Sequence, residues 1–431
     1  MPADAIVKRQ APGSCAENAA GHGSAPAAFQ LHLSVGQHIT TKVLLSGAIK
    51  AAGGELRPAI VGALTKADVD RIYATCPGVR IEGLPPEAVA EAQLVDPVWG
   101  PLQRVVLGWA AEAAVRHEGS TGGVLTALAQ YLLSSGRVDF ILHVKAHQSE
   151  PSFGQATLSF TTTQVVEGAG SRYGPTAPLI DIEAALALGR PLAIVAKPCD
   201  LNALRNLAHL DARVNRLIRY WLTPVCGGYM PDAALSDVLR KNKIDRAAVT
   251  SLRYRGLGCP GPTTIGLGDG GARSLHYLDF WGEDESAWSL PFRCKICPDG
   301  IGEGADIAAA DIWPNATPDR AASLTDPGVN SILIRTRSGL DLLNAAVHDG
   351  AITLGRDVGV DFLGETQPHQ VKKKRCALAR HQGLRDAGRL APETFGLRLP
   401  ELAAANSAAE NQRERKGAAS RAIKGLSDSE E

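Results

Sequence analysis

The sequence predicts an α/β protein with mixed, largely parallel sheets, flanking helices, cysteine-bearing loops at a sheet edge, and disordered N- and C-terminal tails. Short apolar runs of strand length alternate with segments of helical period, and this alternation favours a parallel sheet covered by helices. Two cysteines stand where a predicted strand gives way to a helix. The predicted strands are 138–144, 191–196, 217–225, 249–255, 331–337 and 351–354.

The predicted helices follow from the spacing of apolar residues. Residues 120–135 place a stripe of apolar side chains, including Leu128 and Leu132, on one helical face. A hairpin is expected over 263–274, because Asp269-Gly270 is a typical two-residue turn. The other predicted helices are 67–74, 198–210, 231–241 and 339–348.

Composition divides the 431 residues into four parts. Residues 1–65 form a poorly defined N-terminal region, and residues 386–431 form a charged low-complexity tail. We expect both to be largely disordered, because segments of such composition bury little apolar surface. Residues 66–185 and 186–385 form the two parts of the predicted folded core.

Charge and hydropathy exclude several classes of protein. The chain has 45 basic and 45 acidic residues, so no overall charge favours nucleic acid as a partner. Its longest apolar runs are too short to cross a bilayer, which predicts no membrane span. Residues 1–13 contain no apolar core of signal-peptide length. We therefore expect a soluble cytoplasmic protein.

Cysteine is the strongest functional signal. The eight cysteines are too few for a disulfide scaffold in a chain of this length. Cys294 and Cys297 form a CxxC pair that can bind one metal centre from a single turn. Cys199 and Cys226 follow predicted strands, so they can meet this pair at the carboxyl edge of a parallel sheet.

Four converging thiolates suit an iron–sulfur cluster or a structural zinc ion. All-cysteine zinc sites usually have two CxxC pairs, whereas here one pair joins two single cysteines, which favours the cluster. Buried core cysteines or reactive cysteines are the third interpretation. Cys259 is a rival for one ligand position, since it lies in a loop flanked by glycine.

Ser120, Thr121, Gly122 and Gly123 open the helix predicted over 120–135. Small residues allow a phosphate to approach the free N–H groups at the start of a helix, and the two hydroxyls can add hydrogen bonds. An ordinary helix cap explains the same residues equally well. The segment lacks the lysine of a P-loop and the glycine spacing of a dinucleotide-binding turn.

Further candidate residues lie nearby in the sequence. Arg172 and Tyr173 stand in a loop with glycine and proline, which suits a flavin or nucleotide, although a structural loop would look the same. Lys197 can supply positive charge to a reduced flavin or an anionic substrate, unless it is a solvated surface lysine. His117 is the best candidate for proton transfer, and a structural histidine is its simpler interpretation.

Six motifs occur in a characteristic order along the chain. They are Cys76-Pro77-Gly78, Gly119–Gly123, Arg172-Tyr173-Gly174-Pro175, Lys197-Pro198-Cys199-Asp200, Cys226-Gly227, and Cys294–Cys297 followed by Ala305-Asp306-Ile307. In this order they resemble the coenzyme F420 hydrogenase/dehydrogenase beta subunit family over residues 70–380. That family includes 7-hydroxymethyl chlorophyll a reductases and ferredoxin-dependent divinyl chlorophyllide reductases.

The resemblance implies an FAD-binding iron–sulfur flavoprotein that passes electrons between a cluster and an organic acceptor. Its electron partner would be ferredoxin or a hydrogenase/dehydrogenase-type subunit. The implied FAD contacts, in residues 66–185, are Ser120, Thr121, Gly122, Gly123, Arg172 and Tyr173. The implied ligands of a [4Fe-4S] cluster, in residues 186–385, are Cys199, Cys226, Cys294 and Cys297.

Two departures from the family pattern bear on these expectations. Many members carry an N-terminal ferredoxin-like cysteine set, whereas this chain has only Cys15 there. Cys76-Pro77 therefore resembles the last ligand of a set whose other members are absent. Lys197 stands where many relatives have threonine, which changes the charge beside the expected cofactor site.

Three functions are consistent with these observations. The first is an FAD- and [4Fe-4S]-dependent oxidoreductase whose small-molecule acceptor is a deazaflavin, a tetrapyrrole or another conjugated compound. The second is a non-catalytic electron-transfer subunit of a larger complex. The third is a zinc-stapled binding protein without a redox role.

Overall fold

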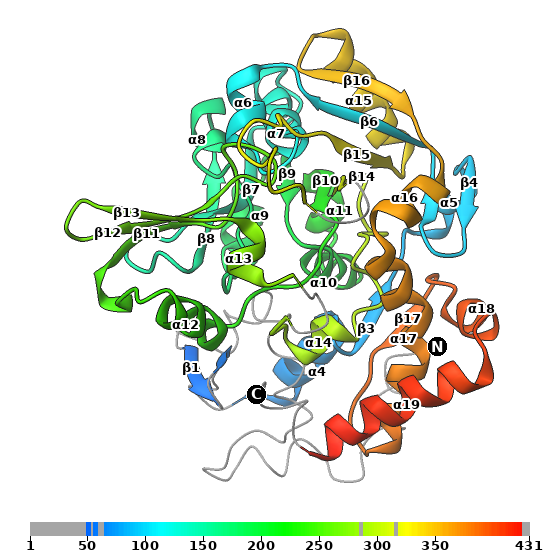
Figure 1. The fold of residues 1–431 in the computed structure, drawn as a ribbon. Coiled ribbons are helices and arrows are strands. Elements are labelled where there is room, and N and C mark those ends of the chain that lie inside the picture. Colours follow the sequence, from blue (N-terminus) through cyan, green and yellow to red (C-terminus); the bar gives the residue numbers. More distant parts are fainter. Residues whose placement is uncertain (1–48, 53–54, 59–63, 284–287, 314–317, 425–431) are drawn as a thin grey trace.

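The fold centres on one eight-stranded sheet with helices on both faces, as the computed structural model in Figure 1 shows. The structure describes residues 49–52, 55–58, 64–283, 288–313 and 318–424. The disorder predicted at the N-terminus falls mainly outside these residues. The strand order is β16-β6-β15-β14-β10-β9-β7-β8. In chain order the strands are β6 (Arg104–Ala110), β7 (Phe140–Ala146), β8 (Gly154–Ser159), β9 (Leu192–Val195), β10 (Ile218–Pro224), β14 (Ile307–Asp311), β15 (Asn330–Ile334) and β16 (Ile352–Asp357).

The sheet is mixed, as predicted, and its parallel part lies at the centre. β14, β10, β9 and β7 pair in parallel, whereas the strands on either side pair antiparallel. Strands from both predicted core parts share this sheet, since β6 inserts between β15 and β16. The carboxyl ends of the four parallel strands therefore meet at one edge.

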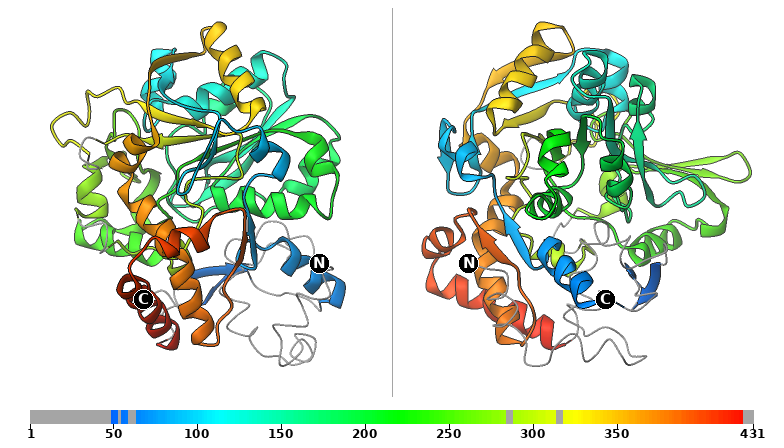
Figure 2. Two further views of the ribbon diagram at one scale, coloured as in Figure 1. Left: turned by 90° about the vertical axis from the view of Figure 1, so that its right-hand side faces the viewer. Right: turned by 180° about the vertical axis from the view of Figure 1, so that it is seen from behind.

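Helices cover both faces of this sheet (Figures 1 and 2). The larger helices are α4 (Lys66–Thr75), α7 (Val124–Ser134), α10 (Pro198–Ala208), α12 (Asp232–Lys241), α15 (Arg337–His348), α17 (Pro368–Asp386) and α19 (Ala408–Ile423). The shorter ones are α5 (Pro86–Ala90), α6 (Ala113–Glu118), α8 (Thr162–Val166), α9 (Ile182–Ala187), α11 (Arg213–Leu217), α13 (Tyr277–Trp281), α14 (Phe292–Lys295), α16 (Val360–Thr366) and α18 (Leu399–Ala404).

Alternating side chains on the strands explain the two covered faces. Val106 of β6 packs in the cluster formed with α7 and α15, while its neighbour Val105 packs in the cluster formed with α16 and α17. On β9, Ala193 and Ile194 divide in the same way, with Ile194 packing beside α9 and α10. Successive strand residues point to opposite faces, so both faces are buried.

Smaller sheets surround the central one. The meander β11-β12-β13 projects from one side of the molecule and includes the predicted hairpin (Figure 1). Its strands are β11 (Val249–Arg253), β12 (Thr263–Leu267) and β13 (Ala272–Leu275). The two-stranded sheets pair β1 (Ile49–Ala52) with β2 (Glu55–Pro58), β3 (Arg80–Glu82) with β17 (Glu393–Phe395), and β4 (Leu94–Asp96) with β5 (Gly100–Leu102).

Much of the charged C-terminal segment is helical, although it was predicted to be largely disordered. α18 and α19 lie within the segment 386–431, and α19 packs along α17. Ala418 and Ala422 of α19 are buried beside Leu384 of α17. Small residues allow the two helices to approach closely. The composition of the segment does not predict this contact. Figure 2 shows these helices on one side of the molecule.

The basic run Lys372–Arg375 on α17 is partly buried. Lys374 is only 2% exposed and forms an ion pair with Glu303, which is fully buried. Arg398 contacts the other oxygen of the same carboxylate. Burial lowers the pKa of Lys374 to about 7. This buried ion pair links α17 to the loop after Cys297. Separating the two charges would leave each of them buried without a partner, which is strongly unfavourable.

The described part of the chain contains no helix that is both long and apolar enough to cross a membrane.

Gly383 is predicted to be required for the packing of α17 against α19. A Cβ atom at this position would lie 2.2 Å from the carbonyl oxygen of Arg415. We expect Gly383→Ala to lower the free energy of unfolding by about 1–3 kcal/mol, measured by thermal denaturation, because the helices must separate. Gly364→Ala is the control, since its Cβ would meet only Val371 at 4.0 Å. An equal effect of both substitutions would contradict the close-packing argument.

Candidate functional site

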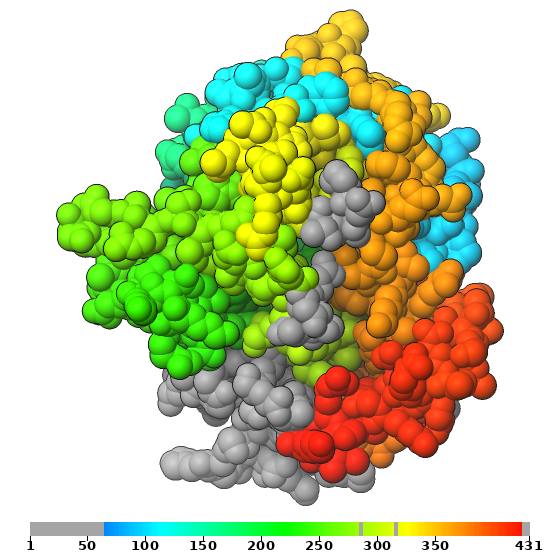
Figure 3. Space-filling model, in the orientation of Figure 1, coloured from blue at the N-terminus to red at the C-terminus, as the bar shows by residue number. Residues whose placement is uncertain are grey.

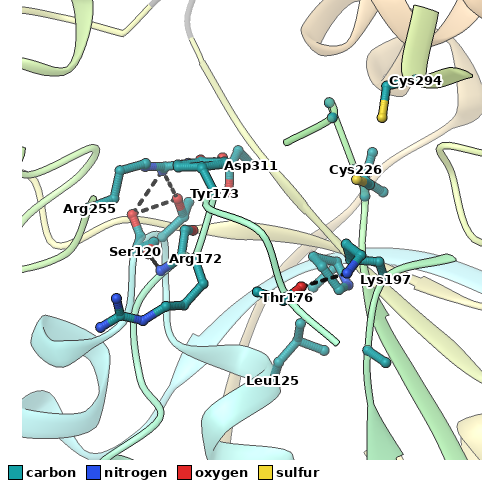
Figure 4. Close-up of a pocket in the computed structure, with 18 of the residues that line it drawn as sticks. Ser120, Leu125, Arg172, Tyr173, Thr176, Lys197, Cys226, Arg255, Cys294 and Asp311 are labelled. Carbon is teal, nitrogen blue, oxygen red and sulfur yellow. Dashed lines mark hydrogen bonds and ion pairs between the residues drawn. The ribbon is translucent and has the colours of Figure 1, made fainter. Parts of the chain in front are cut away.

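A cavity of about 800 Å³ opens beside the carboxyl edge of the parallel strands. Figure 4 shows its polar wall on one side and the cysteine loops on the other. Sequence-predicted residues from distant segments line this one cavity, namely Ser120, Thr121, Gly123, Arg172, Tyr173, Lys197, Cys226 and Cys294. The fold therefore brings five of the six predicted flavin residues to one cavity with two of the four predicted metal ligands.

The turn before α7 needs glycine for steric reasons. Gly122 and Gly123 have φ angles of 67° and 69°, a conformation that favours glycine. A Cβ at Gly122 would lie 2.8 Å from the Asn330 side-chain oxygen. Gly122 thus faces Asn330 and is not among the residues that line the cavity, unlike Ser120, Thr121 and Gly123. α7 itself begins at Val124, four residues later than the predicted start.

Arg255 organises the polar wall, and the sequence reading did not identify it. Its side chain is 1% exposed and forms an ion pair with Asp311, with 2.5 Å between Nη1 and Oδ2. Nη2 donates hydrogen bonds to the Ser120 carbonyl at 3.0 Å and to Thr121 Oγ1 at 2.6 Å. Nη1 also donates to the Tyr173 hydroxyl at 2.9 Å. One guanidinium therefore joins the glycine-rich turn, the Tyr173 loop and β14.

Aromatic rings complete this wall. The Arg255 guanidinium carbon lies 5.2 Å from the ring centre of Tyr277 and 4.9 Å from that of Trp313. Trp281 contacts Tyr173 edge to face, with 5.0 Å between ring centres. Contacts of this kind stabilise a buried cation and hold flat surfaces in place. No motif marks Arg255, because its partners come from segments far apart in the sequence.

Arg172 and Tyr173 are held in place by backbone contacts. Arg172 Nη1 donates to the Leu252 carbonyl of β11 at 2.9 Å, and the Met230 amide donates to the Tyr173 carbonyl at 2.7 Å. The neighbouring Ser171 amide donates to Ser120 Oγ at 2.5 Å. The loop and the glycine-rich turn therefore form one continuous rim of the cavity.

Lys197 caps the start of α10 and points into the cavity (Figure 4). Its Nζ donates to Thr176 Oγ1 at 2.6 Å and lies 3.1 Å from Asp200 Oδ2. Burial alone would lower the pKa of Lys197, but Asp200 and the Cys199 thiol raise it above its ordinary value. Lys197 is thus a fixed positive charge in the cavity wall rather than a solvated lysine.

The four predicted cysteine ligands come from three loops near the sheet edge. Cys199 is in the first turn of α10, Cys226 follows β10, and Cys294 and Cys297 lie in and just after α14. The Cys226 thiol interacts electrostatically with each of the other three. In Figure 4 the sulfur of Cys294 points toward the Cys226 loop. The fold therefore groups the predicted set.

Burial raises the pKa of three of these thiols. It raises the pKa of Cys294 to about 11, and it also raises the pKa of Cys199 and Cys297. Such thiols are neutral at pH 7, and binding of a metal is what deprotonates a coordinating thiol. Arg293 interacts with the thiols of Cys199 and Cys294, so a positive charge lies beside them.

Other cysteines are placed differently. Cys259 lies with its sulfur 4.0 Å from Thr121 Oγ1, in the polar wall, and burial raises its pKa to about 12. Cys76 is buried at the end of α4 and interacts with Arg293. Across the residues that the structure describes, no group of three or more His, Cys, Asp or Glu side chains is arranged to hold a metal ion.

His117 does not reach the cavity. It lies in α6, its side chain is exposed, and its carbonyl accepts a hydrogen bond from the Leu257 amide at 2.9 Å. His143 and His369 line the cavity instead. Burial lowers the pKa of each to about 4, so both are neutral at pH 7. The position of His117 one turn before the glycine-rich segment suggested proximity, but α6 turns its side chain outward.

Two sequence profiles match this chain. The N-terminal part of the coenzyme F420 hydrogenase/dehydrogenase beta subunit matches residues 105–182, and its C-terminal part matches residues 189–358. Together they cover more than half of the chain. The chain belongs to the coenzyme F420 hydrogenase/dehydrogenase beta subunit family.

Individual members of this family are distant relatives. The beta subunit of F420-dependent formate dehydrogenase 1 from Methanococcus maripaludis is 25% identical, covering 56% of this chain and 59% of that protein. The coenzyme F420-dependent sulfite reductase of Methanocaldococcus jannaschii is 25% identical, covering 53% of this chain and 35% of that protein. The chain thus spans about three fifths of the first relative and about a third of the second. Both relatives are named as oxidoreductases or their subunits.

A solved structure has the same fold. A chain of the F420-reducing [NiFe] hydrogenase complex from Methanosarcina barkeri superposes with a TM-score of 0.52 at 18% identity. The match covers 67% of this chain and 96% of that one. The family fold therefore extends over most of the described core.

α17 follows the residues matched by the family profiles and ties down the cysteine loops. Gln370 Nε2 donates to the Cys226 carbonyl at 2.9 Å, and Lys373 Nζ donates to the Gly227 carbonyl at 3.2 Å. Arg380 Nη1 donates to the Lys295 carbonyl at 2.6 Å, and His381 Nε2 donates to the Ile296 carbonyl at 3.0 Å. One helix thus fixes the backbone on both sides of the thiol group.

Gln370 is predicted to be needed for the geometry of the Cys226 loop. Gln370→Leu leaves the Cys226 carbonyl without this donor, so we expect the free energy of unfolding to fall by about 1–3 kcal/mol. The rate of Cys226 alkylation should rise, measured by mass spectrometry. Gln382→Leu, at an exposed position on the same helix, is the matched control. If Cys226 reacts equally fast in both variants, α17 does not hold this loop.

Proposed function

We propose that this chain is an FAD- and [4Fe-4S]-dependent oxidoreductase of the beta-subunit type. It would move electrons between ferredoxin or a partner subunit and an organic acceptor such as a deazaflavin or a tetrapyrrole. The observation that carries the proposal is the shared cavity, which is lined both by the glycine-rich turn and by Cys226 and Cys294. A flavin exchanges hydride and a cluster exchanges single electrons, so a protein that holds both can connect two kinds of redox partner.

The cavity wall supports the flavin part of this proposal. A volume of about 800 Å³ is within the range of pockets that bind cofactors. The start of α7 lines it beside Thr121, and a helix start attracts phosphate through its free N–H groups. Arg172 adds a cation, and Tyr173 and Trp281 add aromatic surface. These residues would hold the diphosphate and the flat rings of FAD.

The thiol group supports the cluster part. Sulfur is the donor that iron–sulfur clusters use, and the Cys226 thiol interacts electrostatically with those of Cys199, Cys294 and Cys297. Their negative charge on binding iron would be offset by Lys197, Arg293 and Lys373, each of which interacts with at least one of these thiols. Cations therefore stand beside both parts of the site, which supports the binding of two anionic cofactors.

The second candidate function is a non-catalytic electron-transfer subunit of a larger complex. The relatives favour it in one respect, since one is named as a dehydrogenase beta subunit and another belongs to a hydrogenase complex. Turnover of the isolated chain separates the two. Reduction of coenzyme F420 or a tetrapyrrole by the isolated chain with reduced ferredoxin supports the enzyme, whereas reduction only in the presence of a further subunit supports the relay.

Replacing a cysteine ligand tests the cluster directly. We expect Cys294→Ser and Cys297→Ser, purified without oxygen, to lose the broad visible absorption of the cluster and its iron. Cys376→Ser is the control, because this buried thiol lies on α17 apart from the proposed group. Cys259→Ser tests the rival ligand and should also keep the cluster. Full iron content in both Cys294 and Cys297 variants would show that the ligand assignment is wrong.

Replacing Arg172 tests the flavin site. Arg172→Ala removes a charge-assisted hydrogen bond to phosphate, which contributes about 1.5–3 kcal/mol and so weakens FAD binding by about ten- to a hundredfold. FAD retained through gel filtration is measured by its fluorescence after release. Arg219→Ala, at an exposed position on β10, should retain FAD as the unaltered chain does. Unchanged retention by Arg172→Ala contradicts the assigned role.

A further inference from the structure

A basic patch lies beside the cysteine loops. We define it as Lys295 of α14, Lys372, Lys373 and Arg380 of α17, and Arg421 of α19, all of which line the outer end of the cavity. Glu414 of α19 lines the cavity beside the patch, and it is paired with Arg380 at 2.9 Å. Because the whole chain has equal numbers of acidic and basic residues, this patch is a local excess of positive charge.

Much of this charge faces solvent. Lys295, Lys372 and Arg421 are exposed, and no described carboxylate forms an ion pair with any of them. Lys373 and Arg380 are partly used inside the protein, since they donate to the carbonyls of Gly227 and Lys295. Within the described residues, the exposed cations therefore have no ion-pair partner, while the others anchor the patch to the cysteine loops. In Figure 3, α17 and α19 form the orange and red part of this face.

The patch lies beside two of the proposed cluster ligands. Lys295 is exposed and stands between Cys294 and Cys297, both of which are half-buried. Lys373 interacts with the thiols of both cysteines. A redox protein bound over Lys295 would thus meet this chain beside the loop that carries Cys294 and Cys297.

We propose that the basic patch is the docking surface for an acidic electron-carrier protein of the ferredoxin type. The proposal rests on the proposed function, because it assigns the partner of the same redox site. One electron would leave the reduced carrier and enter the cluster held by Cys294 and Cys297, with no bond formed and no proton required. The charges of the patch would attract and orient the carrier, as is usual for weak electron-transfer encounters.

A carrier protein fits this surface better than a nucleic acid. α17 and α19 contain no Phe, Tyr or Trp, so their surfaces offer no rings on which single-stranded bases could stack. A duplex would need only phosphate contacts, which the patch could supply, but it would gain nothing from the adjacent thiols. Proximity to the cysteine loops is what distinguishes the two partners.

The test is the binding of oxidised two-cluster bacterial ferredoxin to the full chain, measured by surface plasmon resonance. We expect the dissociation constant to rise steeply between ionic strengths of about 0.1 M and about 1 M, where the screening length falls from about 10 Å to about 3 Å. Lys295→Glu and Lys372→Glu should each weaken binding at low salt by about three- to tenfold, mainly through slower association.

Lys241→Glu is the matched control, since Lys241 is an exposed lysine at the end of α12, and it should bind ferredoxin as the unaltered chain does. Absence of ferredoxin binding overturns the proposal, as does equal binding by all three variants. Competition by duplex DNA that binds more tightly than ferredoxin also overturns it, in favour of a nucleic-acid surface.

The result is separable from that of the proposed function. Binding of oxidised ferredoxin does not require a cluster in this chain, whereas the cysteine substitutions report the cluster alone. A chain that binds ferredoxin through Lys295 and Lys372 but contains no iron keeps the docking surface and refutes the function. If the chain contains iron and flavin but does not bind ferredoxin, only the docking surface is refuted.

Discussion

The site depends on the parallel pairing of β14, β10, β9 and β7. Parallel strands place their carboxyl ends at one edge of the sheet, and each of these ends supplies part of the cavity. β9 leads to Lys197 and Cys199, β10 leads to Cys226, and β14 ends at Asp311. If β10 ran antiparallel, Cys226 would lie at the opposite edge, and the thiols could not be grouped.

Charge organises the two sides of the cavity in different ways. On the polar wall, Arg255 is buried with Asp311 and fixes the glycine-rich turn and the Tyr173 loop through its remaining donors. On the cysteine side, cations lie beside thiols whose ordinary state at pH 7 is neutral. The first arrangement is complete in the protein alone. The second gains a counter-charge only when the thiols lose their protons, as metal binding requires.

Much of the architecture could be predicted from the sequence. The β9 and β10 segments are short apolar runs followed by helix starts, so the grouping of Cys199 with Cys226 followed from the parallel-sheet rule. β14 was not predicted as a strand, because Ile307–Asp311 consists mostly of alanine and gives no clear period. α19 was predicted as a disordered tail, since its burial depends on a few alanines meeting Gly383. Local sequence patterns predict local structure. They do not predict which distant segments pack together, as α17 and α19 do.

The same reason explains which residues of the site could be predicted from the sequence. Ser120, Thr121, Arg172 and Lys197 were found because they form local motifs. Arg255 and α17 contact residues that are far away in the sequence, so no local motif identifies them. His117 was chosen because it precedes the glycine-rich turn in the sequence, but α6 turns its side chain outward. The sequence also left Cys259 as an alternative ligand. Only the structure shows that its sulfur lies beside Thr121 in the polar wall.

The proposed function requires a flavin and an iron–sulfur cluster in the same chain, beside one cavity. The most direct measurement is the cofactor content of the full chain purified without oxygen, by analysis of iron, zinc, acid-labile sulfide and released flavin beside the absorption spectrum. We expect about four iron atoms and about four sulfide ions with one FAD in each chain. A colourless protein, or one that contains zinc in place of iron and no flavin, would contradict it.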